Sequence, residues 1–115
     1  MIANGREVGT VTIIDLSGPL TMGRGDVVLR REIGGLLQSG RKRVVLNLRD
    51  VPYVDSAGVG ELLACHMRVQ SAGGDIKLLS LSQRVFDLLD LSQLLDQFET
   101  FEDEAQALSS FASPT

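Results

Sequence analysis

The sequence has little of what metal centres, disulfide frameworks and aromatic cores require. Tryptophan is absent, aromatic residues make up 4% of the 115 residues, and there is one cysteine and one histidine. A single cysteine cannot form an intrachain disulfide or supply a thiolate cluster for a metal. The core must therefore consist mainly of leucine, valine and isoleucine, and the sequence predicts no metal and no cofactor.

The chain also lacks a positive net charge and a long hydrophobic run. Acidic residues outnumber basic ones by 15 to 11, whereas a nucleic-acid-binding protein needs a basic face that displaces counterions. No apolar run approaches the ~18 to 20 residues of a membrane span, and the N-terminus lacks the layout of a signal peptide. We therefore expect a cytoplasmic protein that neither binds nucleic acid nor inserts into a membrane.

One short basic run stands out against this acidic background. It comprises Arg41, Lys42 and Arg43. The simpler interpretation is a solvated loop between two elements of secondary structure. The alternative is an anion-binding patch.

Hydrophobic patterning predicts strands that alternate with helices. Strands are expected at 8–16, 43–48, 75–80 and 98–101, with residues 1–7 as a candidate edge strand. Helices are expected at 26–39, from 56 to about 71, after Ser82 and at 103–111. This order predicts a single α/β domain over residues 1–115, with a mixed, mostly parallel sheet of four to five strands and about four helices. Residues 112–115 are expected to form a flexible tail.

Three further expectations concern side chains on these helices. Asp26 is expected to cap the first helix. The buried stripe of the second helix is expected to contain Val59, Leu62, Leu63 and Met67. The inward face of the last helix is expected to contain Ala105, Leu108 and Phe111.

The segment 55–60 is a candidate functional site. It reads Asp-Ser-Ala-Gly-Val-Gly and joins the strand at 43–48 to the second helix. Partners of α/β proteins bind at such carboxyl ends of strands, where helix N-termini expose unpaired N–H groups. The Ser56 hydroxyl could simply cap the helix. However, Gly58 and Gly60 weaken the first turn and leave a bare surface, which indicates docking by another protein.

The block 55–62 closely resembles the signature of STAS domains, the family of anti-sigma factor antagonists. The similarity continues over 11–18, 43–55 and 73–81, and so covers nearly the whole chain. It implies that Ser56 is phosphorylated. It also implies a partner-binding surface that contains Asp55, Ser56, Ala57, Gly58, Val59 and Gly60. Thr21 stands where many members carry an acidic residue, in a loop that could belong to the same surface.

The resemblance implies a function as well as a fold. In that family the partner is both an anti-sigma factor and an ATPase-type serine kinase, and a phosphatase reverses the modification. The chain is therefore expected to sequester such a kinase while Ser56 is unmodified. The alternative is a non-phosphorylated STAS adaptor in a stress-signalling scaffold or a transporter complex. The oligomeric state is not predicted.

The residues do not predict catalysis. Ser56 and His66 are ten residues apart on one helix, which separates them by about 15 Å. The Gly-x-Ser-x-Gly elbow of hydrolases is absent. Cys65 is expected to be a small buried thiol and not a nucleophile, and His66 a partly exposed or well-satisfied packing residue. The sequence therefore predicts a protein that is not an enzyme.

Overall fold

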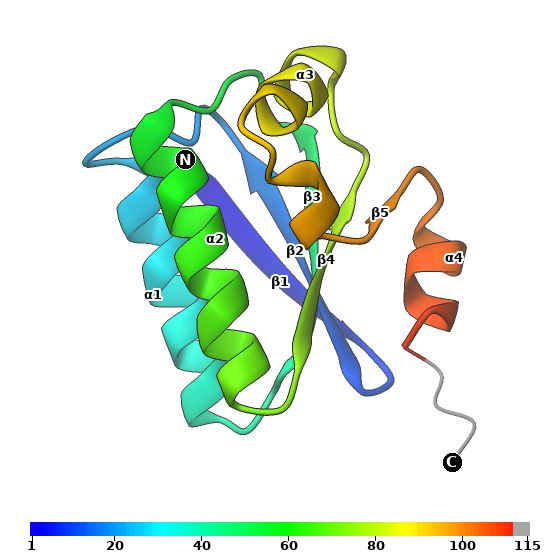
Figure 1. Cartoon of the computed structure of the whole chain (residues 1–115). Helices are drawn as coiled ribbons and strands as arrows, with labels where there is room; N and C mark the ends of the chain where they lie inside the picture. The colour runs from blue at the N-terminus through cyan, green and yellow to red at the C-terminus, as the bar shows by residue number, and fades with distance from the viewer. Residues whose placement is uncertain (112–115) are drawn as a thin grey trace.

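The computed structural model describes residues 1–111 as one five-stranded sheet with helices on both faces (Figure 1). The strands are β1 (Ile2–Val8), β2 (Val11–Ser17), β3 (Arg43–Asp50), β4 (Asp75–Leu79) and β5 (Thr100–Phe101). The α-helices are α1 (Gly25–Gln38), α2 (Ser56–Ser71), α3 (Gln83–Leu91) and α4 (Glu104–Ser109), and a 3₁₀ turn, η1, spans Leu95–Gln97. The predicted tail at 112–115 lies outside the described residues.

The sheet is mixed, as predicted. Its order is β1-β2-β3-β4-β5, with β1 antiparallel to β2 and the other neighbours parallel. The candidate edge strand at residues 1–7 is therefore confirmed as β1. The strand predicted at 8–16 begins too early, because Val8 ends β1 and Gly9 (φ +63°) and Thr10 form the tight turn before β2.

The core lies on both sides of the central strands. Val44, Val45 and Leu46 of β3 are all fully buried, as is typical of a continuous apolar run in a strand that is covered on both faces. The helices α1, α2 and α3 cover one face of the sheet, and α4 lies on the other (Figure 1). The two faces therefore belong to two separate hydrophobic clusters.

Three side-chain predictions are wrong in detail. Asp26 does not cap α1: the helix begins at Gly25, and the Asp26 carboxylate accepts the N–H of Val27 within the first turn. On α2, Met67 is 58% exposed, and the buried face is Gly58, Glu61, Leu62, Cys65, His66 and Val69. Because α2 packs on both the sheet and α1, its buried face is rotated from the predicted stripe. On α4, Ala107 is buried and Ala105 is exposed, whereas Leu108 and Phe111 pack against the core as predicted.

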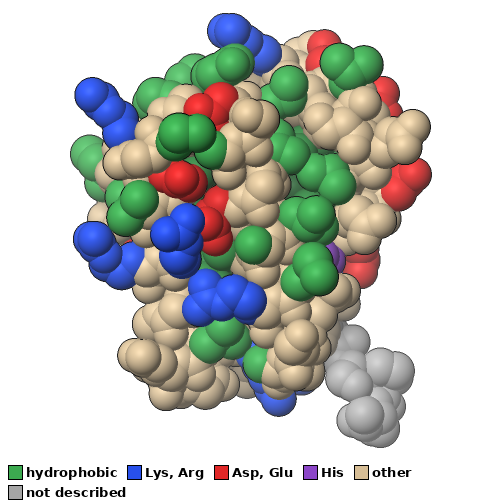
Figure 2. All heavy atoms as spheres, turned by 60° about the vertical axis from the view of Figure 1, so that its left-hand side comes forward, with side chains coloured by type: hydrophobic (Ala, Val, Ile, Leu, Met, Phe, Trp, Pro, Cys, Tyr) green, Lys and Arg blue, Asp and Glu red, His purple; other side chains and the backbone are tan. Residues whose placement is uncertain are grey.

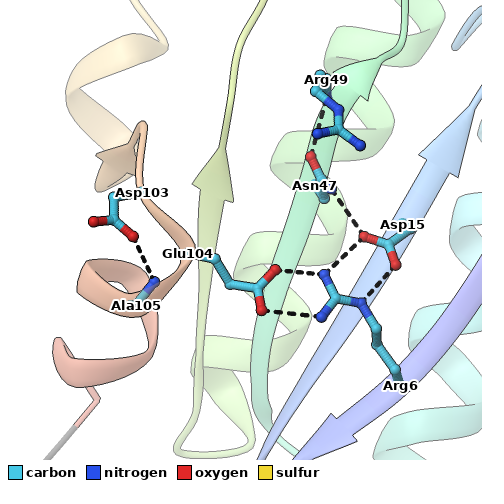
Figure 3. A network of polar contacts seen from close by, with 7 residues as sticks. All are labelled: Arg6, Asp15, Asn47, Arg49, Asp103, Glu104 and Ala105. Carbon is cyan, nitrogen blue, oxygen red and sulfur yellow. Dashed lines mark hydrogen bonds and ion pairs between the residues drawn. The ribbon is translucent and has the colours of Figure 1, made fainter.

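A polar network holds α4 against the sheet (Figure 3). The guanidinium of Arg6 on β1 donates to the Asp15 carboxylate on β2, with a shortest distance of 2.7 Å. It also donates to both carboxylate oxygens of Glu104 on α4. Asn47 of β3 donates to Asp15 at 2.9 Å. Arg6 thus joins β1 to β2 and α4, and Asp15 extends the network to β3.

Within residues 1–111, none of the helices combines the length and the apolar content needed to cross a membrane. Nor do the histidine, cysteine and acidic side chains of this part of the chain form a group of three that could bind a metal.

Candidate functional site

Two loops meet where β3 ends and α2 begins. The N–H of Leu20, after β2, donates to the Tyr53 carbonyl at 2.9 Å, and the Leu20 carbonyl accepts the N–H of Asp55 at 3.2 Å. Leu20 also forms an isolated parallel bridge with Val54. The backbone that carries Ser56 is therefore fixed by the neighbouring loop, and the start of α2 has a defined position.

Asp55, and not Ser56, caps α2. Its backbone is extended (φ −93°, ψ −177°), and its carboxylate accepts the N–H of Gly58 at 2.8 Å and the N–H of Met22 at 3.0 Å. The hydrogen bonds from Met22 and then Gly58 lower the pKa of Asp55, so this carboxylate is ionised at neutral pH. The interpretation of Ser56 as a simple capping residue is therefore wrong.

Ser56 is the first residue of α2, and its side chain is exposed. Among residues 1–111, its hydroxyl has no hydrogen-bond partner, because Asp55 already binds the donor that a capping serine would use. The hydroxyl is therefore free to be modified from outside, and the helix does not depend on it.

The two glycines of the first turn have different roles. Gly58 is buried, and a Cβ there would collide with the carbonyl of Leu20 and with the Val54 side chain. Gly60 is exposed, and a Cβ there would meet nothing within 4 Å. Internal packing therefore explains Gly58, whereas only Gly60 leaves the surface bare.

The remaining predicted residues surround Ser56 less directly. Ala57 and Val59 are half-buried. Thr21 is also half-buried, and its carbonyl accepts the N–H groups of Arg24 and Asp26 at the start of α1. Thr21 precedes Met22, whose N–H binds Asp55, so its loop is part of the same structure.

Sequence reasoning missed two exposed apolar side chains beside the site. Met22 is 72% exposed and Tyr53 is 38% exposed, and the Arg84 guanidinium of α3 lies 4.6 Å from the centre of the Tyr53 ring. The hydrophobic pattern around Pro52 and Val54 does not predict that Tyr53 is exposed. Its contact with Arg84 depends on a helix some thirty residues later.

The outer face of α2 also carries apolar side chains that are wholly or partly exposed. Val59 and Leu63 are half-buried and Met67 is exposed, at spacings of four residues. Figure 2 shows hydrophobic side chains gathered on the α1–α2 side of the molecule, next to arginines and carboxylates. The exposed start of α2 is thus joined to a surface that another protein can cover.

The two residues that could suggest catalysis lie in the core. Cys65 is fully buried, as predicted, and its thiol donates to Glu61 at 3.2 Å. Burial, with a further contribution from Glu61, raises the pKa of Cys65 to about 12, which disfavours the nucleophilic thiolate.

His66 is 3% exposed, and its ring packs against Phe98 at 4.4 Å. Its Nδ1 lies 3.8 Å from the Asp75 carboxylate and has no hydrogen-bond partner within residues 1–111. The expectation that His66 is partly exposed or fully satisfied is therefore wrong, although its packing role is confirmed.

Comparison with known proteins identifies this architecture. Residues 3–107 match the STAS domain family. The chain is 27% identical over 99 residues to the anti-sigma F factor antagonist of Paenibacillus polymyxa, covering 86% of this chain and 85% of that protein. It is 36% identical over 69 residues to the anti-sigma-B factor antagonist of Bacillus subtilis, covering 60% and 62% of the two chains.

A solved structure agrees with the fold. The Bacillus cell fate determinant SpoIIAA in its phosphorylated form superposes with a TM-score of 0.75 at 20% identity, covering 96% of this chain and all of that one. At this identity the likeness is one of fold. The match over residues 3–107 confirms the resemblance seen in the sequence, and the chain belongs to the STAS domain family.

Proposed function

We propose that this protein is an anti-sigma factor antagonist that is switched by phosphorylation of Ser56. The unmodified surface around Ser56 binds an anti-sigma factor that is also a serine kinase of the ATPase type. Phosphorylation by this kinase releases the complex, and a phosphatase restores binding. The observation that carries the proposal is the exposed and unpartnered Ser56 hydroxyl at the first residue of α2.

Local charge supports an off-switch. A phosphate adds about −1.5 to −2 charges at neutral pH. It would stand beside the Asp55 carboxylate, which is already ionised because its pKa is lowered. A partner that covers this point must bury the added charge, and an unpaired buried charge costs several kcal/mol. Because ~1.4 kcal/mol corresponds to a tenfold change in affinity, binding should be largely lost.

The fold should tolerate the modification. Asp55 provides the cap, so a phosphate on Ser56 displaces no hydrogen bond of the native structure. The side chain points to solvent, and the helix N-terminus favours an anion. The switch therefore acts at the contact with the partner, and no refolding is needed.

Binding by a series of variants tests this function. The wild type, Ser56→Ala and Ser56→Asp are titrated by calorimetry with the ATPase-type kinase encoded in the same genome. Ser71→Asp serves as the control, because it places the same charge at the exposed far end of α2.

We expect Ser56→Ala and Ser71→Asp to bind like the wild type. We expect Ser56→Asp to bind at least about tenfold more weakly, because its carboxylate must be buried without a partner. Equal affinity of all four proteins would refute the switch.

A further inference from the structure

A basic cleft lies at the end of the sheet opposite Ser56. It has a volume of about 370 Å³ and is lined by Gly9, Thr10, Gly40, Arg41, Lys42 and Arg43. It is formed by the β1–β2 turn and the connection from α1 to β3, at the lower end of the sheet in Figure 1, whereas α2 begins at the upper end. The whole length of β3 separates the basic cleft from the start of α2, so the two surfaces are independent.

Hydroxyl groups hold the two arginines of the basic cleft in place. The Arg41 Nε donates to the Thr12 hydroxyl at 2.7 Å, and Thr12 is buried. The Arg43 Nη1 donates to the Thr10 hydroxyl at 3.1 Å. Arg43 keeps further N–H donors beyond the one that Thr10 accepts. The Arg41 Nη2 is buried and has no hydrogen-bond partner within residues 1–111. A solvated basic loop would leave these long side chains free, whereas here both are oriented.

Positive charge in the basic cleft is only partly balanced. Arg41 lies 3.5 Å from the Glu7 carboxylate, which is mostly exposed. Within the described part of the chain, no carboxylate lies within 4.0 Å of the charged groups of Lys42 or Arg43. The Lys42 Nζ donates to the Ala72 carbonyl, just after α2, at 3.4 Å. The three cations are thus balanced by one nearby carboxylate in a protein whose net charge is −4.

The walls of the basic cleft leave room for a ligand. Gly9 (φ +63°) and Gly40 (φ +76°) both line it, and a Cβ at either position would enter open space. The volume lies at the lower end of the range of small-molecule sites, about 300–1,000 Å³. Oriented guanidinium groups fit the oxygens of a phosphoryl group better than a single ammonium does.

We propose that the basic cleft binds a small phosphorylated anion, such as inorganic phosphate or a phosphate monoester. Arg41 and Arg43 donate hydrogen bonds to the phosphoryl oxygens, and Lys42 contributes charge. This site does not involve Ser56, so it would let the protein respond to a second signal independently of phosphorylation.

Nuclear magnetic resonance tests the site with inorganic phosphate as the probe. Phosphate is titrated into the full chain while backbone amide shifts are recorded. We expect saturable shifts at millimolar phosphate in the residues that line the basic cleft, and none around Ser56. The Ser56→Asp variant should bind phosphate as the wild type does, which separates this result from the outcome for the proposed function.

A charge-matched pair of variants localises the binding. Lys42→Gln with Arg43→Gln should weaken phosphate binding at least about tenfold, since both charged donors are lost. Arg31→Gln with Arg49→Gln removes the same charge from exposed positions elsewhere and should leave binding unchanged. If the Lys42→Gln, Arg43→Gln double variant loses stability, Lys42→Gln alone is used in its place, because Lys42 is exposed. This single variant should still weaken phosphate binding.

Three outcomes would overturn the proposal. They are shifts that do not saturate, an equal loss of binding in both double variants, and binding to a membrane surface alone. Binding to a membrane is tested by sedimentation of the protein with vesicles of equimolar phosphatidylcholine and phosphatidylglycerol. We expect the protein to stay in the supernatant.

Discussion

At the scale of single residues, two neighbouring side chains at the start of α2 have different roles: Asp55 caps the helix, and Ser56 is exposed. Asp55 binds the N–H groups of Gly58 and Met22, so it stabilises both the helix and the loop after β2. Ser56 makes neither contact and remains exposed. The residue proposed for phosphorylation therefore makes no hydrogen bond on which the native structure depends.

The reactivity of Cys65 follows from its surroundings. Its side chain is fully buried and its pKa is raised to about 12, chiefly by burial. We expect no reaction of the native protein with Ellman's reagent at neutral pH, and one equivalent of reaction in denaturant. Prompt labelling of the native protein would show that the core around Glu61 and Cys65 opens readily.

At the scale of elements, the two glycines of α2 provide a matched pair of variants. Gly58→Ala places a Cβ against the Leu20 backbone and should lower the free energy of unfolding by about 1–3 kcal/mol. Gly60→Ala meets no atom within 4 Å. It should be neutral, or stabilising by up to about 1 kcal/mol, because alanine favours a helix.

Urea unfolding of the two variants measures this difference. Equal destabilisation by both substitutions would contradict the assignment of Gly58 to internal packing and of Gly60 to open surface.

The attachment of α4 to the sheet should depend on pH. Hydrogen bonds from Arg6 lower the pKa values of both Asp15 and Glu104. Their stabilising effect is therefore complete above the unfolded-state pKa values of about 4 and is lost as the pH falls through the lower native values. We expect the free energy of unfolding to decrease on acidification over that range.

The variant Arg6→Gln tests the cause of this dependence. All three side chains are more than a third exposed, so the loss at neutral pH should be modest, roughly 1 kcal/mol. Stability should then fall less steeply on acidification, while Arg31→Gln should follow the wild type. An unchanged acid profile of Arg6→Gln would contradict the role of this network.

At the scale of the whole molecule, the sequence predicted the α/β order because each element carries its own signal. The strand at β3 and the helix after Ser82 depend on local features, and both were predicted correctly. Contacts between distant segments were not predictable in this way. The hydrogen bond from the Met22 N–H to the Asp55 carboxylate spans 33 residues, and that between Arg6 and Glu104 spans 98.

In the candidate site, too, the features that depend on local sequence were predicted and those that depend on distant contacts were not. The position of Ser56 at the start of a helix follows from local pattern. The capping role of Asp55 and the burial of Gly58 follow from the approach of the loop after β2, which no local pattern encodes. Met67 was misplaced because the buried face of α2 is set by two neighbours, α1 and the sheet, together.

The proposed switch depends on the effect of one phosphate on the contact between Ser56 and the partner. The most direct measurement compares the unmodified protein with protein that carries a single phosphate on Ser56, confirmed by intact mass, in calorimetric titrations with the partner kinase. We predict that the unmodified form binds and that the phosphorylated form binds at least about tenfold more weakly, while both give the same circular dichroism spectrum. Equal affinity of the two correctly folded forms would contradict the central claim.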